Sequence, residues 1–279
     1  MHSRPWRLLA LTVVATATPS FGIDDLALAE TPVAATSDRL LSNAYASVAG
    51  SSLQPPSIQP VACPDTLRSL PDEGTALPRI RGPLVLHGWN NPWAINSFKK
   101  DLYWFRPGNV RLRDGSLVFT VTEGASGQAQ ANENEKSVSA LFEVDATTDR
   151  GVPGLIQSPL YLFGDDAHEI DFEILGDKGL QLAIHTKDRF NAYQKLIPGD
   201  FSGRHRYSIE YRAGASVIWF VDGRQVGCAT PRETGGVFPR HPLKPFIETW
   251  PTANTSWAGA WSHTPSTMIV HGYRRTVLR

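Results

Sequence analysis

The sequence predicts an all-β fold, either a sandwich or a barrel of short strands. From Leu77 to the end of the chain, short apolar runs alternate with turn residues, and no stretch has the apolar stripe of an amphipathic helix. The 23 glycines and 21 prolines among 279 residues also favour many turns and few long helices. Repeated short strands over about 200 residues are typical of these all-β folds.

Individual strands follow from alternation and from the turns between them. Arg113–Ser116 contains an Asp-Gly pair between two apolar runs, and Asp222-Gly223 follows a second pair of runs, as in β-hairpins. Trp219 alternates with other apolar residues on its strand and is expected in the core. The predicted strands lie at 109–112, 117–122, 138–144, 169–174, 207–211, 217–221, 224–226 and 268–278.

The first 29 residues have the pattern of a secretory signal. Arg4 and Arg7 precede an uncharged run at 8–17, which is too short to span a bilayer comfortably. Cleavage after Gly22 and cleavage after Ala29 both fit, and an uncleaved anchor or a buried N-terminal helix is the alternative interpretation. We expect a secreted protein, extracellular or periplasmic, with no membrane association after the signal is removed.

Residues 30–76 are rich in Ala, Ser, Thr, Pro and Gln and show no sustained period, which predicts a linker or a loosely attached arm. The body then runs from 77 to 279. Cys63 in the arm and Cys228 in the body are too few for a zinc cluster. After export they could form a disulfide that pins the arm to the body, or remain two unrelated thiols.

The charge balance narrows the classes of partner. The chain has 27 Lys and Arg residues against 27 Asp and Glu residues. A protein that binds nucleic acid needs a basic face to neutralise phosphates, and a membrane-surface protein needs a basic cluster. We therefore expect neither partner, and we expect a monomer with one domain in its body.

Residues 168–173 carry the strongest chemical signal. Side chains two apart on a strand share a face, so Glu169, Asp171 and Glu173 point one way while Ile170 and Phe172 point into a core. Repulsion among three carboxylates raises the pKa of at least one of them. Glycoside hydrolysis needs one ionised carboxylate, as nucleophile or base, and one protonated carboxyl. A solvent-facing acidic strand is the alternative interpretation.

Strand geometry sets a condition on that chemistry. It separates the Cα atoms of Glu169 and Glu173 by roughly 13 Å. A retaining pair needs its carboxyl groups about 5–5.5 Å apart. The two long side chains must therefore lean toward each other over a concave sheet.

The motifs around this strand decide between the two interpretations. Residues 168–176, HEIDFEILG, closely resemble the active-site strand of glycoside hydrolase family 16, usually written DEIDFEFLG. Segments resembling further family motifs follow in the family order and cover about 85–278: 103–110 with 114–117, then 205–211, 219–223 and 257–259.

The resemblance implies a concanavalin-like β-jelly-roll, a sandwich of two antiparallel sheets with a concave substrate cleft. It assigns Glu169 as nucleophile, Asp171 as assisting carboxylate and Glu173 as general acid/base, with retention of configuration. The E-x-D-x-E spacing, without an inserted residue, is similar to the lichenase and xyloglucan transglycosylase branch. No cofactor and no metal are implied, since His271 stands where many members carry an Asp near a structural calcium.

Aromatic rings stack on the apolar faces of sugars, which makes tryptophans cleft candidates. Trp250 and Trp257 are the first choices, and Trp93 is as easily placed in the core as at the cleft edge. His185 occupies the place of a cleft Tyr in the family pattern, with a satisfied sheet residue as the alternative. Glu248 replaces an Asn, which loses an amide next to Trp250.

The sequence therefore predicts an exported, retaining, endo-acting glycoside hydrolase that cleaves a β-linked polysaccharide, a β-glucan or an exopolysaccharide, by double displacement. Two alternatives remain open. One is a transglycosylase on the same scaffold, and the other is a non-catalytic carbohydrate-binding jelly-roll. The sequence does not specify the polysaccharide.

Overall fold

A computed structural model describes residues 63, 66–71, 76–82, 84–86, 93–95, 98–100, 103–149, 151–164 and 168–279. All of them belong to one compact unit, Pro55–Arg279. For 85–86, 93–95 and 98–100 the description covers the backbone alone. The predicted signal at 1–29 and the first part of the arm lie outside the described residues. Within the described residues, no helix is both long and apolar enough to cross a membrane.

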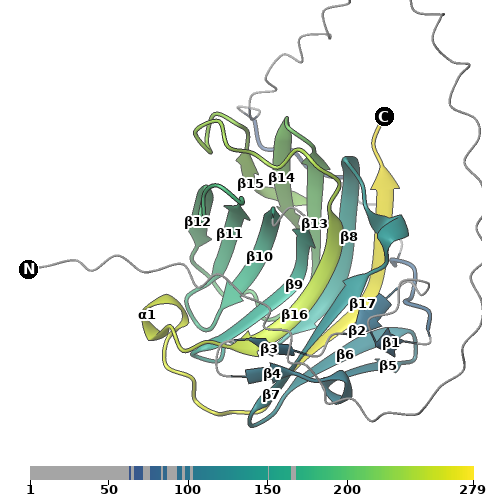
Figure 1. Ribbon diagram of the computed structural model, residues 1–279, viewed down its shortest axis with the longest axis vertical. Coiled ribbons are helices and arrows are strands. Elements are labelled where there is room, and N and C mark those ends of the chain that lie inside the picture. Colours follow the sequence, from purple (N-terminus) through teal and green to yellow (C-terminus); the bar gives the residue numbers. More distant parts are fainter. Residues whose placement is uncertain are drawn as a thin grey trace, which may run out of the picture. The chain divides into compact units, whose positions relative to one another are not determined.

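The described residues form two sheets, which confirms the predicted all-β sandwich (Figure 1). The first, here called the β10 sheet, has the order β1 (Val85–Leu86), β2 (Trp93–Ile95), β7 (Ala125–Ala131), β16 (Lys244–Pro251), β9 (Leu155–Phe163), β10 (Glu169–Leu175), β11 (Leu180–His185) and β12 (Tyr193–Ile197). Beside this path, β4 (Tyr103–Phe105) pairs with β7 and with β3 (Phe98–Lys100).

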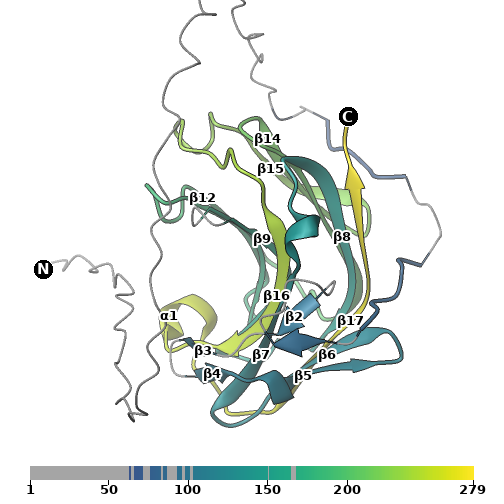
Figure 2. The same cartoon turned by 45° about the vertical axis from the view of Figure 1, so that its right-hand side comes forward.

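The second, here called the β13 sheet, has the order β15 (Arg224–Ala229), β14 (Ser216–Val221), β13 (Gly203–Arg212), β8 (Ser139–Thr148), β17 (Ser266–Val277), β6 (Ser116–Val121) and β5 (Val110–Arg113). Figure 2 shows both sheets curved, with the concave side of the β10 sheet turned away from β8 and β17. Helical structure among the described residues is limited to α1 (Thr255–Ala258) and to 3-10 turns at Pro107–Asn109 and Glu133–Glu135.

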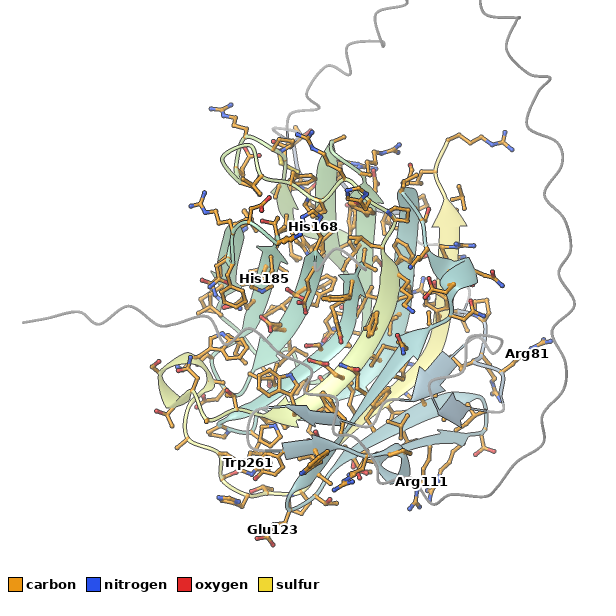
Figure 3. All side chains as sticks on the ribbon, in the orientation of Figure 1. Arg81, Arg111, Glu123, His168, His185 and Trp261 are labelled. Carbon is orange, nitrogen blue, oxygen red and sulfur yellow. A yellow bond between two sulfur atoms is a disulfide. The ribbon has the colours of Figure 1, made fainter. Side chains whose placement is uncertain are left out.

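The core lies between the sheets and fixes the orientation of β10. Ile170 and Phe172 are fully buried, and the Phe172 ring meets the Tyr207 ring of β13 edge-on at 5.4 Å. Burying an apolar side chain of this size is worth about 1.5–3 kcal/mol. Because alternate residues of a strand face opposite ways, the three carboxylates of β10 lie on the side away from the core. In Figure 3, His168 marks the start of β10 and His185 the end of the neighbouring β11.

Strand β9, which pairs with β10 on the side opposite β11, contains an extra residue. The register of β9 with β10 shifts between Asp171 and Ile174, and its register with β16 shifts between Phe246 and Glu248. Both shifts lie opposite the same part of β9, around Pro159, which has no N–H to give to a ladder. Strand β10 itself pairs with β11 without interruption, so its alternation is preserved through all three carboxylates.

The end of the predicted arm is attached to the β13 sheet. Cys63 and Cys228 form a disulfide with their Cα atoms 5.9 Å apart. The N–H of Leu70 donates to the Gly223 carbonyl at 2.7 Å, and the N–H of Gln225 donates to the Arg68 carbonyl at 3.0 Å. In the range 30–76, expected to be a linker or a loose arm, residues 68–70 thus pair with residues 223–225, at the start of the edge strand β15.

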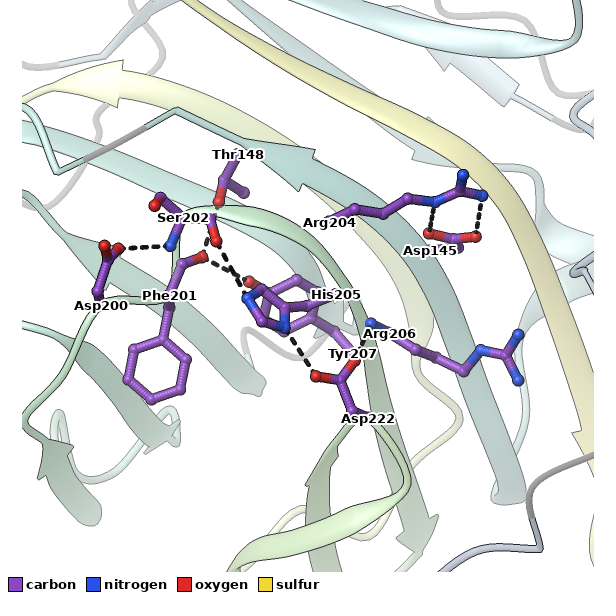
Figure 4. Close-up of polar contacts among 10 residues, drawn as sticks. All are labelled: Asp145, Thr148, Asp200, Phe201, Ser202, Arg204, His205, Arg206, Tyr207 and Asp222. Carbon is purple, nitrogen blue, oxygen red and sulfur yellow. Dashed lines mark hydrogen bonds and ion pairs between the residues drawn. The ribbon is translucent and has the colours of Figure 1, made fainter. Parts of the chain in front are cut away.

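Side-chain bonds fix the start of β13 and the β14–β15 turn (Figure 4). Arg204 binds both carboxylate oxygens of Asp145, at 2.9 and 2.6 Å. His205 and the N–H of Arg206 both bind the Asp222 carboxylate, at 2.7 and 2.9 Å. Asp222 and Gly223 have φ of 50° and 74°, as the predicted Asp-Gly hairpin turn requires.

Candidate active site

The three carboxylates of β10 lie on one face of the strand and differ in exposure. Asp171 is only 2% exposed, whereas Glu169 and Glu173 on either side of it are partly exposed. Across the ladder, Glu169 is opposite His185, Asp171 is opposite Ala183, and Glu173 is opposite Gln181. Each flanking glutamate therefore has a polar neighbour on β11, and the central aspartate lies beside a small residue.

His185 orients toward the central carboxylate. Its Nε2 lies 3.2 Å from Asp171 Oδ2, and its Nδ1 accepts a hydrogen bond of 3.0 Å from the N–H of Asn191. A ring nitrogen that accepts from a backbone N–H carries no proton, so this pattern assigns the neutral tautomer with the proton on Nε2. Nε2 is thus the ring nitrogen within ion-pair distance of the Asp171 carboxylate.

Glu173 is held by an amide whose orientation is fixed. The Gln181 Nε2 donates to Glu173 Oε2 at 2.6 Å. The Gln181 Oε1 accepts from Gln194 Nε2 at 2.6 Å and from Trp257 Nε1 at 3.2 Å. An indole N–H can only donate, so the amide oxygen of Gln181 must face Trp257 and its NH₂ group must face Glu173.

Trp257 is positioned by the short helix α1. The Asn254 side chain caps the helix and accepts from the Trp257 N–H at 3.2 Å, while Lys178 Nζ donates to the carbonyls of Ser256 and Trp257 at 2.7 and 2.9 Å. The ring lies on the wall of a cleft of about 460 Å³. The lining of this cleft includes Glu173, Gln181, His185, Phe190, Gln194, Asn254 and Trp257.

The other predicted aromatic residues are placed differently. Trp250 is 7% exposed, packs with Phe105, Ile156 and Leu175 in a small apolar cluster, and is not among the residues that line this cleft. Its role in stacking on a sugar stays a prediction. Trp257 packs against Trp250, with ring centroids 5.9 Å apart. The backbone of Trp93 pairs with Ala131 on β7, and its side chain lies outside the described residues.

A second polar group lies on the neighbouring strands of the same sheet. Glu248 on β16 is 3% exposed, and its Oε2 accepts from the Tyr161 hydroxyl at 3.0 Å and from the Gln128 amide. Burial, and then the negative charges of Glu248, Glu169 and Asp171, raise the pKa of Tyr161 well above its usual value. The Tyr161 hydroxyl therefore stays protonated and remains a donor near the acidic strand.

Sequence reasoning missed several of these residues. Gln128, Tyr161, Gln194 and Phe190 carry no motif of their own, and each joins the site through partners on other elements. Gln181 begins the family pattern that ends at His185 but was not named as a site residue. Among the described residues, no group of three or more His, Cys, Asp and Glu side chains is arranged to hold a metal ion. His271, which replaces a family Asp, instead bonds Thr147 through Nε2 at 2.7 Å.

The sequence that forms this acidic strand and its sheet matches a known protein family. The family model of glycosyl hydrolases family 16 matches residues 98–268, which is more than half of the chain. The chain belongs to glycoside hydrolase family 16. The matched residues include the whole of β10 and its partners β9, β11 and β16, so the family assignment covers the site described above.

Family 16 proteins of known structure share the fold. A prokaryotic β-1,3-1,4-glucanase (lichenase) from a mouse hindgut metagenome is 22% identical, with a TM-score of 0.58 that covers 67% of this chain and 93% of that one. The apo Crh5 transglycosylase is 20% identical, with a TM-score of 0.50 over 66% of this chain and 86% of that one.

The relatives found by sequence comparison are much longer than the segment that matches this chain. Crh-like protein 4 of Aspergillus fumigatus is 28% identical in an alignment 173 residues long that covers 56% of this chain. The match spans 37% of that protein's length.

Proposed function

We propose that this family 16 chain is an exported, retaining, endo-acting enzyme that cleaves a β-linked glucan by double displacement. The observation that carries the proposal is the arrangement on β10, where Glu169, Asp171 and Glu173 share one face. Across the ladder, Glu169 is opposite His185, Asp171 is opposite the small Ala183, and Glu173 is opposite Gln181, so the three carboxyl groups have different surroundings. A β-glucan is the proposed substrate class because the structural relatives include a β-1,3-1,4-glucanase.

In the first step, the Glu169 carboxylate attacks the anomeric carbon and Glu173, as a carboxylic acid, protonates the departing glycosidic oxygen. Glu173 becomes a carboxylate as the bond breaks, and Gln181 Nε2, which donates to its Oε2 at 2.6 Å, stabilises that negative charge. Because Gln181 is locked by Gln194 and Trp257, the donor needs no reorientation during the step.

Asp171 lies between the nucleophile and the acid/base. It is buried, and His185 Nε2 lies 3.2 Å from its Oδ2. We assign it to positioning the Glu169 carboxyl and moderating its charge, with His185 keeping Asp171 in place. In the second step, Glu173 removes a proton from an incoming hydroxyl, which attacks the anomeric carbon and releases Glu169.

The nature of that hydroxyl separates two candidate functions. Water gives a hydrolase, and a sugar hydroxyl gives a transglycosylase. The transglycosylase is the second candidate because one structural relative with the same fold is the Crh5 transglycosylase. Product analysis with an added oligosaccharide acceptor distinguishes the two, since lengthened chains appear only if a sugar is the acceptor.

The carboxylate roles are tested with Glu169→Gln and Glu173→Gln, which keep shape and remove the charge. Release of reducing ends is measured on a β-1,3-glucan, a mixed-linkage β-1,3-1,4-glucan, a β-1,4-glucan and an exopolysaccharide. We expect turnover to fall by at least about 10³-fold for each variant. Glu123→Gln is the matched control, because Glu123 is exposed on the β6–β7 turn, away from β10 (Figure 3).

Two results would refute these assignments. If either glutamine variant turned over a cleaved substrate as fast as the unmodified protein, its role would be wrong. If the unmodified protein bound a glycan, released no reducing ends from any of these substrates and transferred no chain to an added oligosaccharide acceptor, the chain would be a non-catalytic binding jelly-roll.

A further inference from the structure

Among the side chains that the structure describes, one aromatic ring that lines the cleft is highly exposed. Phe190, in the loop between β11 and β12, is 76% exposed. Its ring stacks on the His185 ring with centroids 4.3 Å apart and an interplanar angle of 15°. One face of Phe190 is thus covered by a residue that also faces Asp171, and the rest of the ring is open to solvent.

The loop holds this ring in place through its own hydrogen bonds. Thr186 and Arg189 bond each other through both backbone and side-chain groups, at 3.0 to 3.2 Å. Asn191 adopts a left-handed conformation, with φ of 53°, and its N–H reaches His185 Nδ1 at 3.0 Å. Phe190 is therefore presented on a fixed turn and needs little ordering to receive a ligand.

The cleft beneath Phe190 has the character of a sugar site. Phe190 and Trp257 supply aromatic surface, while Gln181, Gln194 and Asn191 supply amide groups. Sugar rings present apolar C–H faces to aromatic rings and hydroxyls to amides. Few side chains in the lining carry charge, which suits a neutral ligand.

Glu173 determines which part of the substrate this cleft receives. It lines the cleft together with Phe190. In the proposed function Glu173 protonates the leaving oxygen and later deprotonates the acceptor hydroxyl, so both the leaving and the accepting sugar must lie on its side of the scissile bond.

We propose that Phe190 is the stacking platform for the acceptor sugar, the residue that lets a β-gluco-oligosaccharide compete with water for the glycosyl-enzyme. This inference rests on the proposed function and specifies its second step. The acceptor hydroxyl gives its proton to Glu173, its oxygen bonds to the anomeric carbon, and the bond to Glu169 breaks to release the carboxylate. A sugar stacked on Phe190 brings its hydroxyl to Glu173 at high effective concentration.

The test compares Phe190→Ala with Phe190→Tyr, which keeps the ring, and with Val277→Ala, which trims an exposed residue at the end of β17 on the other sheet. The donor is a β-gluco-oligosaccharyl fluoride, because fluoride leaves without occupying the acceptor cleft. Fluoride release reports the first step, and a fluorescently labelled β-gluco-oligosaccharide reports transfer.

We expect Phe190→Ala to lower the ratio of transfer to hydrolysis roughly threefold to tenfold, as lost stacking implies, which is a larger factor than any fall in fluoride release. Phe190→Tyr restores the ratio, and Val277→Ala leaves it unchanged. A transfer ratio unaffected by Phe190→Ala, an equal fall in fluoride release, or no transfer by the unmodified protein would each overturn the acceptor role.

A binding measurement separates this inference from the proposed function. In a Glu169→Gln background, the labelled oligosaccharide is titrated against variants with and without Phe190→Ala, and we expect the alanine to weaken binding threefold to tenfold. If Phe190→Ala leaves the affinity for the oligosaccharide unchanged, Phe190 is not the stacking platform, even if the protein proves to be catalytic. Absence of fluoride release by the unmodified protein overturns the proposed function, and with it the acceptor role, whatever the titration shows.

Discussion

The indole N–H of Trp219 donates a hydrogen bond of 3.0 Å to the backbone carbonyl of Asp171. Trp219 belongs to β14 in one sheet and Asp171 to β10 in the other, so the bond crosses the core directly behind the acidic face. It meets β10 where the register with β9 begins to shift. A bulge interrupts a ladder locally, and here a buried side chain supplies a donor at that point.

Trp219→Phe tests this cross-sheet bond. The phenyl ring keeps apolar packing but leaves the carbonyl without the indole donor, which costs about 1–3 kcal/mol of unfolding free energy, with a further loss from unfilled volume. We also expect kcat to fall, because Asp171 lies between the two proposed catalytic glutamates. Urea denaturation and turnover assays measure the two effects.

The control for that variant is Phe142→Leu. Phe142 is fully buried in β8 and has no polar atom, so its shortening costs packing energy alone. We expect a stability loss with kcat retained in the folded protein. If Phe142→Leu lowered kcat as much as Trp219→Phe, the bond to Asp171 would have no special part in positioning the site.

Tyr161→Phe leaves the buried Glu248 carboxylate with one fewer donor. We expect this change to lower the free energy of unfolding by about 1–3 kcal/mol, since a hydrogen bond to a charged group is lost. In a Glu248→Gln background the same change should cost less, because the remaining acceptor is neutral. A double-mutant cycle by urea denaturation measures the difference. Equal costs in both backgrounds would show that Tyr161 contributes through packing alone.

The Cys63–Cys228 disulfide closes a long stretch of chain, with a sequence separation of 165. Constraining that loop in the unfolded chain is worth about 3–5 kcal/mol. The Cys63→Ser, Cys228→Ser double variant should therefore melt at a lower temperature. It should keep its activity, because the bond joins the arm to the β13 sheet and the proposed site is on the other sheet. Thermal unfolding with and without reductant is the measurement, and reductant should not affect the double variant.

His271 gives a pH dependence of stability. Burial, and then the charge of Arg204, lower its pKa, with Asp145 opposing. The folded pKa lies below the unfolded value of about 6.5, so the unfolded chain binds more protons between the two values and stability falls as pH drops through that window. Above it, His271 contributes no pH dependence.

His271→Gln should therefore flatten the change in unfolding free energy between pH 7.5 and pH 5, measured by urea denaturation at each pH. His263→Gln is the control, since His263 is exposed. A wild-type slope that survived His271→Gln would assign the acid sensitivity to other groups.

Much of the site could be predicted from local pattern. Period-two alternation places Glu169, Asp171 and Glu173 on one face because it depends on neighbouring residues alone, and the Asp222-Gly223 turn follows from the φ values that Gly and Asp tolerate. The apolar residues between the carboxylates indicate which face meets the core. These features need no knowledge of distant strands.

The rest depends on contacts between residues far apart in sequence. Glu248 meets Tyr161 and Gln128 across separations of 87 and 120 residues, and Gln181 meets Trp257 across 76. Composition did not separate Trp250 from Trp257, because turn residues surround both in the sequence. In the structure Trp250 is on β16 and Trp257 on α1, and only packing decides which ring is covered. Phe190 looks like an ordinary turn residue until its stacking on His185 is seen.

The hydrogen bonds of the arm also bear on how the protein behaves at high concentration. Strand β15 ends the β13 sheet, and an uncovered terminal strand can recruit the strand of another molecule. Arg68, Ser69 and Leu70 pair along residues 223–225, and Cys63 is bonded to Cys228 further along the same strand. Residues 68–70 thereby occupy backbone groups at this sheet edge that a strand of another molecule would otherwise need for pairing.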